Sequence, residues 1–69
     1  MTAGDVLIRP LDSKYLVLDA ASRSVLDGPF DLFAEALDAA LGFVKPGHNI
    51  WQENIDNRGR EIGPPTRIL

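Results

Sequence analysis

A single amphipathic segment between Asp31 and Val44 constrains the fold of this chain more than any other feature. Its apolar residues recur at i, i+4, i+7, i+8 and i+11, the spacing of one face of an α-helix, at Phe33, Leu37, Ala40, Leu41 and Val44. Asp31 suits the N-cap, because its carboxylate can accept from the open N–H groups of the first turn. Gly42, Pro46 and Gly47 end the segment. The sequence therefore predicts one helix at about 31–44.

Three short segments before this helix have the composition of strands. Residues 5–9, 15–19 and 24–26 are rich in valine, leucine and isoleucine, and turn-forming residues such as Pro10 and Gly28 separate them. Short connections of this kind predict an antiparallel meander.

The segment after the helix predicts a further hairpin. Residues 49–55 alternate between apolar and polar side chains, as a strand does, and the turn at 56–59 begins with aspartate and ends with glycine. A short returning strand at 60–62 is expected to stop at Gly63, Pro64 and Pro65. We therefore predict an α+β fold: an antiparallel sheet of about four to five strands, in the order βββαβ with a final short β, packed on one face by a single helix at about 31–44. One domain spans 1–69, and residues 1–4 and 63–69 are expected to be flexible ends.

The composition limits what can stabilise this domain. The chain has 69 residues, no cysteine and one histidine, His48. Disulfides are therefore excluded, and a transition-metal site lacks the companion histidines and cysteines that it needs. We expect no cofactor and a core built from aliphatic and aromatic side chains.

The net charge of −3 disfavours nucleic acid and anionic membranes as partners. The apolar runs are strand-sized, which predicts no membrane span. The first residues lack the basic region and apolar core of a signal peptide, so a cytoplasmic location is expected.

One helix can cover only one face of the predicted sheet. In the second strand Leu16 and Leu18 alternate with Tyr15 and Val17. We expect the leucines to lie beneath the helix, because Asp19 belongs to the other set and cannot be buried unpaired.

The uncovered face supports the leading functional hypothesis. Tyr15 and Val17 are expected there, and either orientation of the last long strand adds apolar groups, although the pattern leaves open which face Trp51 takes. Half-exposed sheets often carry such residues for cross-strand packing alone. The hypothesis is a non-enzymatic protein-binding or homodimerising module that uses Tyr15, Val17 and Trp51, with pairing at a sheet edge as a related route.

The alternative hypothesis places a weak nucleic-acid or anion site on the loops around the last long strand. Four basic residues lie there, with Trp51 between them: Lys45, His48, Arg58 and Arg60. Cations beside an aromatic ring can hold a phosphate or stack on a base. Dispersed, solvated side chains on an acidic protein explain the same pattern.

The sequence has no catalytic constellation, so an enzyme is not expected. Ser13, Ser22 and Ser24 lack the Gly-x-Ser-x-Gly elbow of a nucleophilic serine. The carboxylates of the helical segment have the spacing of a solvated helix face.

A resemblance adds to this interpretation. Asp27-Gly28-Pro29-Phe30 leads into Ala34-Glu35-Ala36-Leu37, and Asp56-Asn57-Arg58-Gly59 forms a later turn. This arrangement resembles small uncharacterised bacterial domains in which a twisted meander precedes a helix and a hairpin. The resemblance implies that layout and a bacterial source, without an activity. The layout is also similar to double-stranded-RNA-binding domains, but the lysine-rich second helix of that family is missing.

Overall fold

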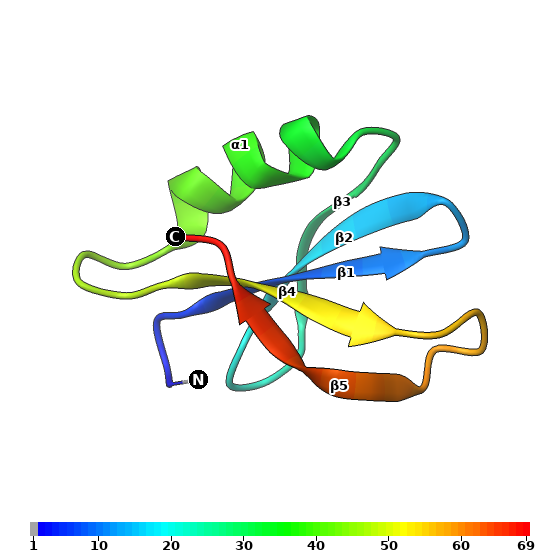
Figure 1. The fold of residues 1–69 in the computed structure, drawn as a ribbon. Coiled ribbons are helices and arrows are strands. Elements are labelled where there is room, and N and C mark those ends of the chain that lie inside the picture. Colours follow the sequence, from blue (N-terminus) through cyan, green and yellow to red (C-terminus); the bar gives the residue numbers. More distant parts are fainter. Residues whose placement is uncertain (1) are drawn as a thin grey trace.

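The computed structural model describes residues 2–69 as a five-stranded sheet with one helix packed on it (Figure 1). The elements follow the order βββαββ: β1 (Val6–Leu11), β2 (Lys14–Asp19), β3 (Val25–Phe30), α1 (Phe33–Phe43), β4 (Ile50–Ile55) and β5 (Glu61–Arg67). The predicted α+β fold, with a helix on one face of the sheet, is confirmed.

The sheet is mixed, so the prediction of a fully antiparallel sheet is wrong. Its strand order is β3-β2-β1-β4-β5, and β1 pairs with β4 in parallel, with Leu7 opposite Trp51. The other three pairs are antiparallel. The helix is the cause: α1 carries the chain from the end of β3 back along the sheet, so β4 starts at the same end as β3 and β1.

The helix begins one residue later than its charge pattern suggests. Leu32 is the N-cap residue, and the side chain of Glu35 accepts a hydrogen bond from the Leu32 N–H at 3.2 Å. Asp31 does not cap the helix but forms an ion pair with Lys14 of β2. The last helical turn closes where the Val44 N–H donates to the Ala40 carbonyl at 3.0 Å.

The main core lies between α1 and the sheet. Side chains from three strands meet two fully buried alanines of the helix: Val6, Ile8, Val17 and Ile50 pack with Ala36 and Ala40. The small alanines let the helix approach closely. Tyr15 joins this core, with its ring edge-on to Phe33 at a centroid distance of 5.6 Å.

The predicted orientation of β2 is therefore wrong. Tyr15 and Val17 lie beneath the helix, and Leu16 and Leu18 lie on the opposite face. Asp19 does not forbid this arrangement because it ends the strand, where its carboxylate accepts hydrogen bonds from the Ser22 N–H and hydroxyl, both at 2.9 Å.

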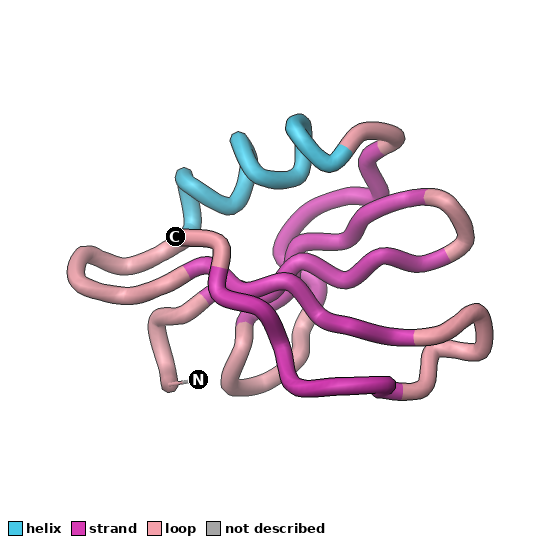
Figure 2. The backbone as a smooth tube through the Cα atoms, in the orientation of Figure 1, coloured by secondary structure: helices cyan, strands magenta, loops and turns pink. Residues whose placement is uncertain are grey.

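A second apolar cluster forms on the face without a helix. Leu7, Leu18 and Ala20 are buried there, and Leu16 and Trp51 pack against them. The sheet is strongly twisted (Figure 2), and irregular pairing in β2–β3 and β4–β5 adds to that twist. With Leu16 and Trp51 packed against them, Leu7 and Leu18 are buried without a covering helix.

Strand β5 is longer than the short returning strand at 60–62 that the sequence predicts. Strand β5 continues through Gly63 to Arg67, and the Ile68 N–H donates to the Ile50 carbonyl at 2.7 Å. Ile68 also packs against the main core. The predicted stop at the two prolines fails because β5 is an edge strand and its pairing with β4 is irregular between Gln52 and Asn54. Pro64 and Pro65 lie at this irregularity and have no partner in the strand register.

The N-terminal segment is tied down as well. The Gly4 carbonyl accepts from the Lys45 N–H at 3.1 Å, and the Asp5 N–H donates to Thr2 at 3.0 Å. The predicted flexible start covers residues 1–4, of which Met1 lies outside the described residues.

Both edge strands contain proline. Pro29 lies in β3, after a cis peptide bond, and Pro64 and Pro65 lie in β5. Gly28 has φ +106°, and a side chain there would come within 2.9 Å of the Tyr15 carbonyl oxygen. Glycine is therefore required at this position of the edge.

Candidate binding face

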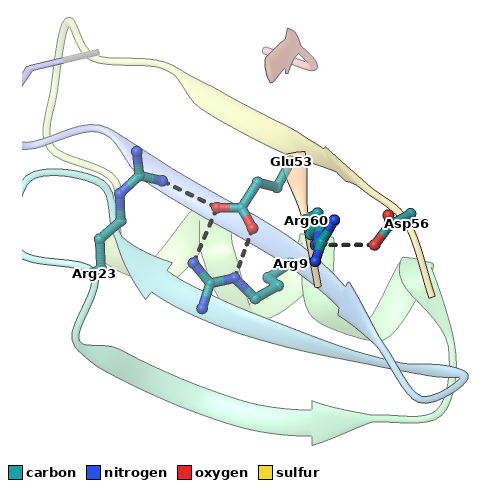
Figure 3. Close-up of polar contacts among 5 residues, drawn as sticks. All are labelled: Arg9, Arg23, Glu53, Asp56 and Arg60. Carbon is teal, nitrogen blue, oxygen red and sulfur yellow. Dashed lines mark hydrogen bonds and ion pairs between the residues drawn. The ribbon is translucent and has the colours of Figure 1, made fainter. Parts of the chain in front are cut away.

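We call the sheet surface opposite α1 the open face. It combines the second apolar cluster with three charged side chains that strand alternation and the β2–β3 turn place beside it: Arg9, Arg23 and Glu53. Figure 3 shows these three side chains over the strands, with α1 behind the sheet.

Glu53 is the centre of the charged group. Its side chain is only 8% exposed, and Arg9 binds both of its oxygens, with Nε at 2.6 Å from Oε1 and Nη2 at 3.1 Å from Oε2. A buried carboxylate is costly unless it is paired and hydrogen-bonded, and this two-point contact meets that need. The same contact raises the pKa of Arg9 above its ordinary value.

Arg23 brings a second positive charge to the same carboxylate. It lies in the β2–β3 turn with φ +65°, and its Nη1 is 3.1 Å from Glu53 Oε2. Its side chain remains 44% exposed, and that of Arg9 32%. Two guanidinium groups on one carboxylate leave an excess of one positive charge at this point of the face.

A buried aspartate fixes the aromatic part of the open face. Asp5 is 3% exposed and accepts hydrogen bonds from the Trp51 indole N–H at 2.9 Å and the Asn49 N–H at 3.0 Å. Thr2 N and His48 Nδ1 complete its contacts at 3.3 and 3.1 Å. The Asn49 N–H, with the help of the other donors, lowers the pKa of Asp5 to about 2 against the effect of burial. Trp51 is thereby held in one orientation.

The first predicted site is only partly assembled. Trp51 lies on the open face, half-buried, whereas Tyr15 and Val17 lie on the helix side. The three side chains therefore do not form one surface.

The predicted cationic group is divided between two ends of β4. Lys45 and His48 precede the strand, and Arg58 and Arg60 follow it. Six residues of strand separate them by roughly 20 Å. The backbone N–H groups of Arg58 and Arg60 donate to Asp56 at 2.8 and 2.9 Å, and Figure 3 includes the second of these bonds. The four basic residues are therefore not brought together around one ligand.

The sequence interpretation missed Arg9, Arg23, Glu53 and Asp5. The sequence contains one indication for Glu53: it lies between Trp51 and Ile55 in an alternating strand, so it shares a face with two apolar side chains. Arg9 is similarly placed after Leu7. Their pairing could not be found from spacing, since 44 residues separate Arg9 from Glu53.

The sheet also carries a shallow pocket at one end. A shallow pocket of about 150 Å³ lies between the β1–β2 and β4–β5 turns, lined by Pro10, Leu11, Asp12, Ser13, Ile55, Asp56 and Asn57. Small-molecule sites are usually at least twice this volume. Across residues 2–69, no cluster of three or more histidine, cysteine or carboxylate side chains is arranged to hold a metal ion.

Comparisons do not assign the chain to a family. No family model matches the sequence, and no curated protein or solved structure matches it either. The resemblance to small bacterial domains therefore stays a prediction. In the part of the chain that the structure describes, no helix has the length and apolar character needed to cross a membrane.

Proposed function

We propose that this chain is a non-enzymatic binding module that recognises a protein through its open face. One observation carries the proposal: a half-buried tryptophan and two partly exposed arginines share one surface. Tryptophan and arginine are the residue types that most often supply the binding energy of protein interfaces.

The open face is held in place before any partner arrives. The indole of Trp51 is fixed by Asp5, and the guanidinium of Arg9 is fixed by Glu53. Binding then costs less side-chain entropy than it would with mobile groups. This supports an interface rather than a loose solvated surface.

The apolar part of the open face extends to the sheet edge. Val25 of β3 is opposite Leu18 in the strand register and is 58% exposed. Because cross-strand partners share a face, Val25 lies next to the buried cluster. A partner can therefore contact this exposed apolar side chain without any rearrangement of the fold.

A photo-crosslinking experiment tests this proposal. The chain carries p-benzoylphenylalanine at Val25 in one variant and, as a matched control, at Leu41 on the exposed side of α1, which is 52% exposed. The variants are irradiated in cells that naturally make the chain. We expect one discrete protein adduct from position 25 and none of that mass from position 41.

A second measurement separates the two kinds of partner. An adduct of twice the chain mass, with a sedimentation coefficient that rises with concentration, identifies a second copy. A different mass with a concentration-independent coefficient identifies another protein. If neither position forms an adduct, or if both form the same one, the open face is not the interface and the proposal fails.

A further inference from the structure

We propose that Arg9 and Arg23 together bind a carboxylate of the partner, so that the segment recognised on the open face is acidic. This inference rests on the proposed function and adds the chemistry of the ligand. It starts from the excess of positive charge at Glu53.

The two arginines keep hydrogen-bond donors for a ligand. A guanidinium carries five N–H donors. Within residues 2–69, the side chain of Arg9 uses two of its nitrogens and that of Arg23 uses one, all on Glu53. Both side chains reach the surface, so the remaining N–H groups are available to an incoming anion.

Neutralising Glu53 does not require both arginines. Arg9 alone contacts both carboxylate oxygens, as a stable buried pair needs. Arg23 adds a whole charge from a separate turn, where it contacts only one oxygen. A purely structural ion pair leaves this second guanidinium without a role, whereas a carboxylate ligand would use it.

The charge around the pair favours an acidic ligand although the chain as a whole is negative. Arg67 is opposite Trp51 in the β4–β5 register and so lies on the open face. On that face the cations Arg9, Arg23 and Arg67 are partly or fully exposed, whereas two of the three acids, Asp5 and Glu53, are buried and only Glu61 is exposed. The acids of α1, Glu35 and Asp38, lie across the sheet.

A carboxylate matches this site better than a phosphate. The excess at Glu53 is one positive charge, equal to the single negative charge of an aspartate or glutamate side chain. The neighbouring Trp51 and Leu16 form an apolar surface. The apolar side chains of a peptide can cover this surface, whereas a free phosphate cannot. The ligand we infer is an extended segment in which acidic and apolar residues alternate.

Titrations followed by NMR test the inference on the full chain. The signals are the Nε–Hε resonances of Arg9 and Arg23. The probes are a blocked six-residue peptide of alternating glutamate and leucine, the same peptide with glutamine in place of glutamate, and inorganic phosphate. We expect saturable shifts of both resonances with the glutamate peptide and none with the glutamine peptide.

Two variants with the same change of charge provide the control. In Arg23→Gln, Glu53 keeps both of its contacts with Arg9, so the fold is retained, and we expect the affinity for the glutamate peptide to fall about tenfold or more. Arg58→Gln removes an exposed cation from the far turn and leaves the affinity within about twofold, since surface charges act weakly at such range. Equal weakening by both variants would show a general charge effect and overturn the inference.

Two further outcomes also test the inference. Binding of phosphate at lower concentration than the glutamate peptide would overturn the choice of carboxylate. A crosslinked partner at position 25, together with a peptide that binds no better than its glutamine version, would leave the proposed function intact and remove this inference alone.

Discussion

Replacing Asp5 with asparagine perturbs a buried carboxylate that links the start of β1 to β4 and to the loop before β4. Its Oδ1 accepts from Asn49 and His48, and its Oδ2 accepts from Trp51 and Thr2. Asparagine has nearly the same shape but only one acceptor oxygen. Its NH2 group must therefore face one of these pairs of donors.

The expected loss follows from the pKa. Lowering the pKa of Asp5 from 3.8 to about 2 corresponds to about 2 kcal/mol of stability, at about 1.36 kcal/mol per pH unit. Leaving a buried donor unsatisfied adds at least about 1 kcal/mol. We expect Asp5→Asn to lower the free energy of unfolding at pH 7 by about 3 kcal/mol, a large share of the total for a domain of this size.

Urea unfolding followed by the fluorescence of the single tryptophan measures this loss. Asp38→Asn on α1 makes the same change of charge at an exposed position and should shift stability by less than about 0.5 kcal/mol. An Asp5→Asn midpoint equal to that of the parent chain would refute the assigned role of the carboxylate.

The pH dependence gives a second check on the same reasoning. The pKa of Asp5 is lower in the folded chain than in the unfolded one, so its contribution is complete above about pH 4 and is lost as the pH falls through about 2. The difference in stability between the parent chain and Asp5→Asn should therefore shrink over that interval. A difference that stays constant from pH 6 to pH 2 would contradict the depressed pKa.

Three further substitutions test other contacts by the same urea assay. Gly28→Ala should destabilise by about 1–3 kcal/mol, because a methyl group at positive φ meets the Tyr15 carbonyl; a neutral effect would mean that the edge adjusts freely. Ile68→Ala should cost about 2 kcal/mol, as expected for a half-buried core side chain, whereas a frayed end would lose nothing. Glu53→Ala should lower the free energy of unfolding by about 3 kcal/mol or more, because it leaves Arg9 partly buried without its partner. An unchanged free energy of unfolding would show that the fold does not need this ion pair.

The helix and the positions of the strands could be predicted from the sequence because they depend on local spacing. The strand ends could not, since β1, β3 and β5 run past Pro10, Gly28 and Gly63. The stripe from Phe33 to Val44 has the period of a helix whatever surrounds it, and the alternation in β4 is equally local. The direction of β4 could not be found in this way. It depends on where the chain leaves α1 and on which strand β4 then pairs with, and both are properties of the whole fold.

The predicted faces of β2 are wrong because the prediction depends on Asp19. The prediction treated Asp19 as a group in the middle of a buried face, whereas it ends the strand and binds Ser22. An acid at a strand end says little about which face is buried. The alternation itself was correct, and one wrong premise reversed every side chain together.

The candidate site was mostly beyond prediction, since Arg9, Arg23 and Glu53 come from three distant segments. Trp51 was the exception. A large aromatic residue in an alternating strand is a good candidate for an interface even when its face is unknown.

The prolines of the two outer strands have a consequence for how this molecule can meet others. Pro29 on one side and Pro64 and Pro65 on the other offer no amide hydrogen to a neighbouring backbone. Backbone-to-backbone extension of the sheet, the route by which small β-rich proteins stack into fibrils, is interrupted at both borders. A partner of the proposed open face would then be recognised through side chains, and substitutions there can change the specificity without altering the backbone.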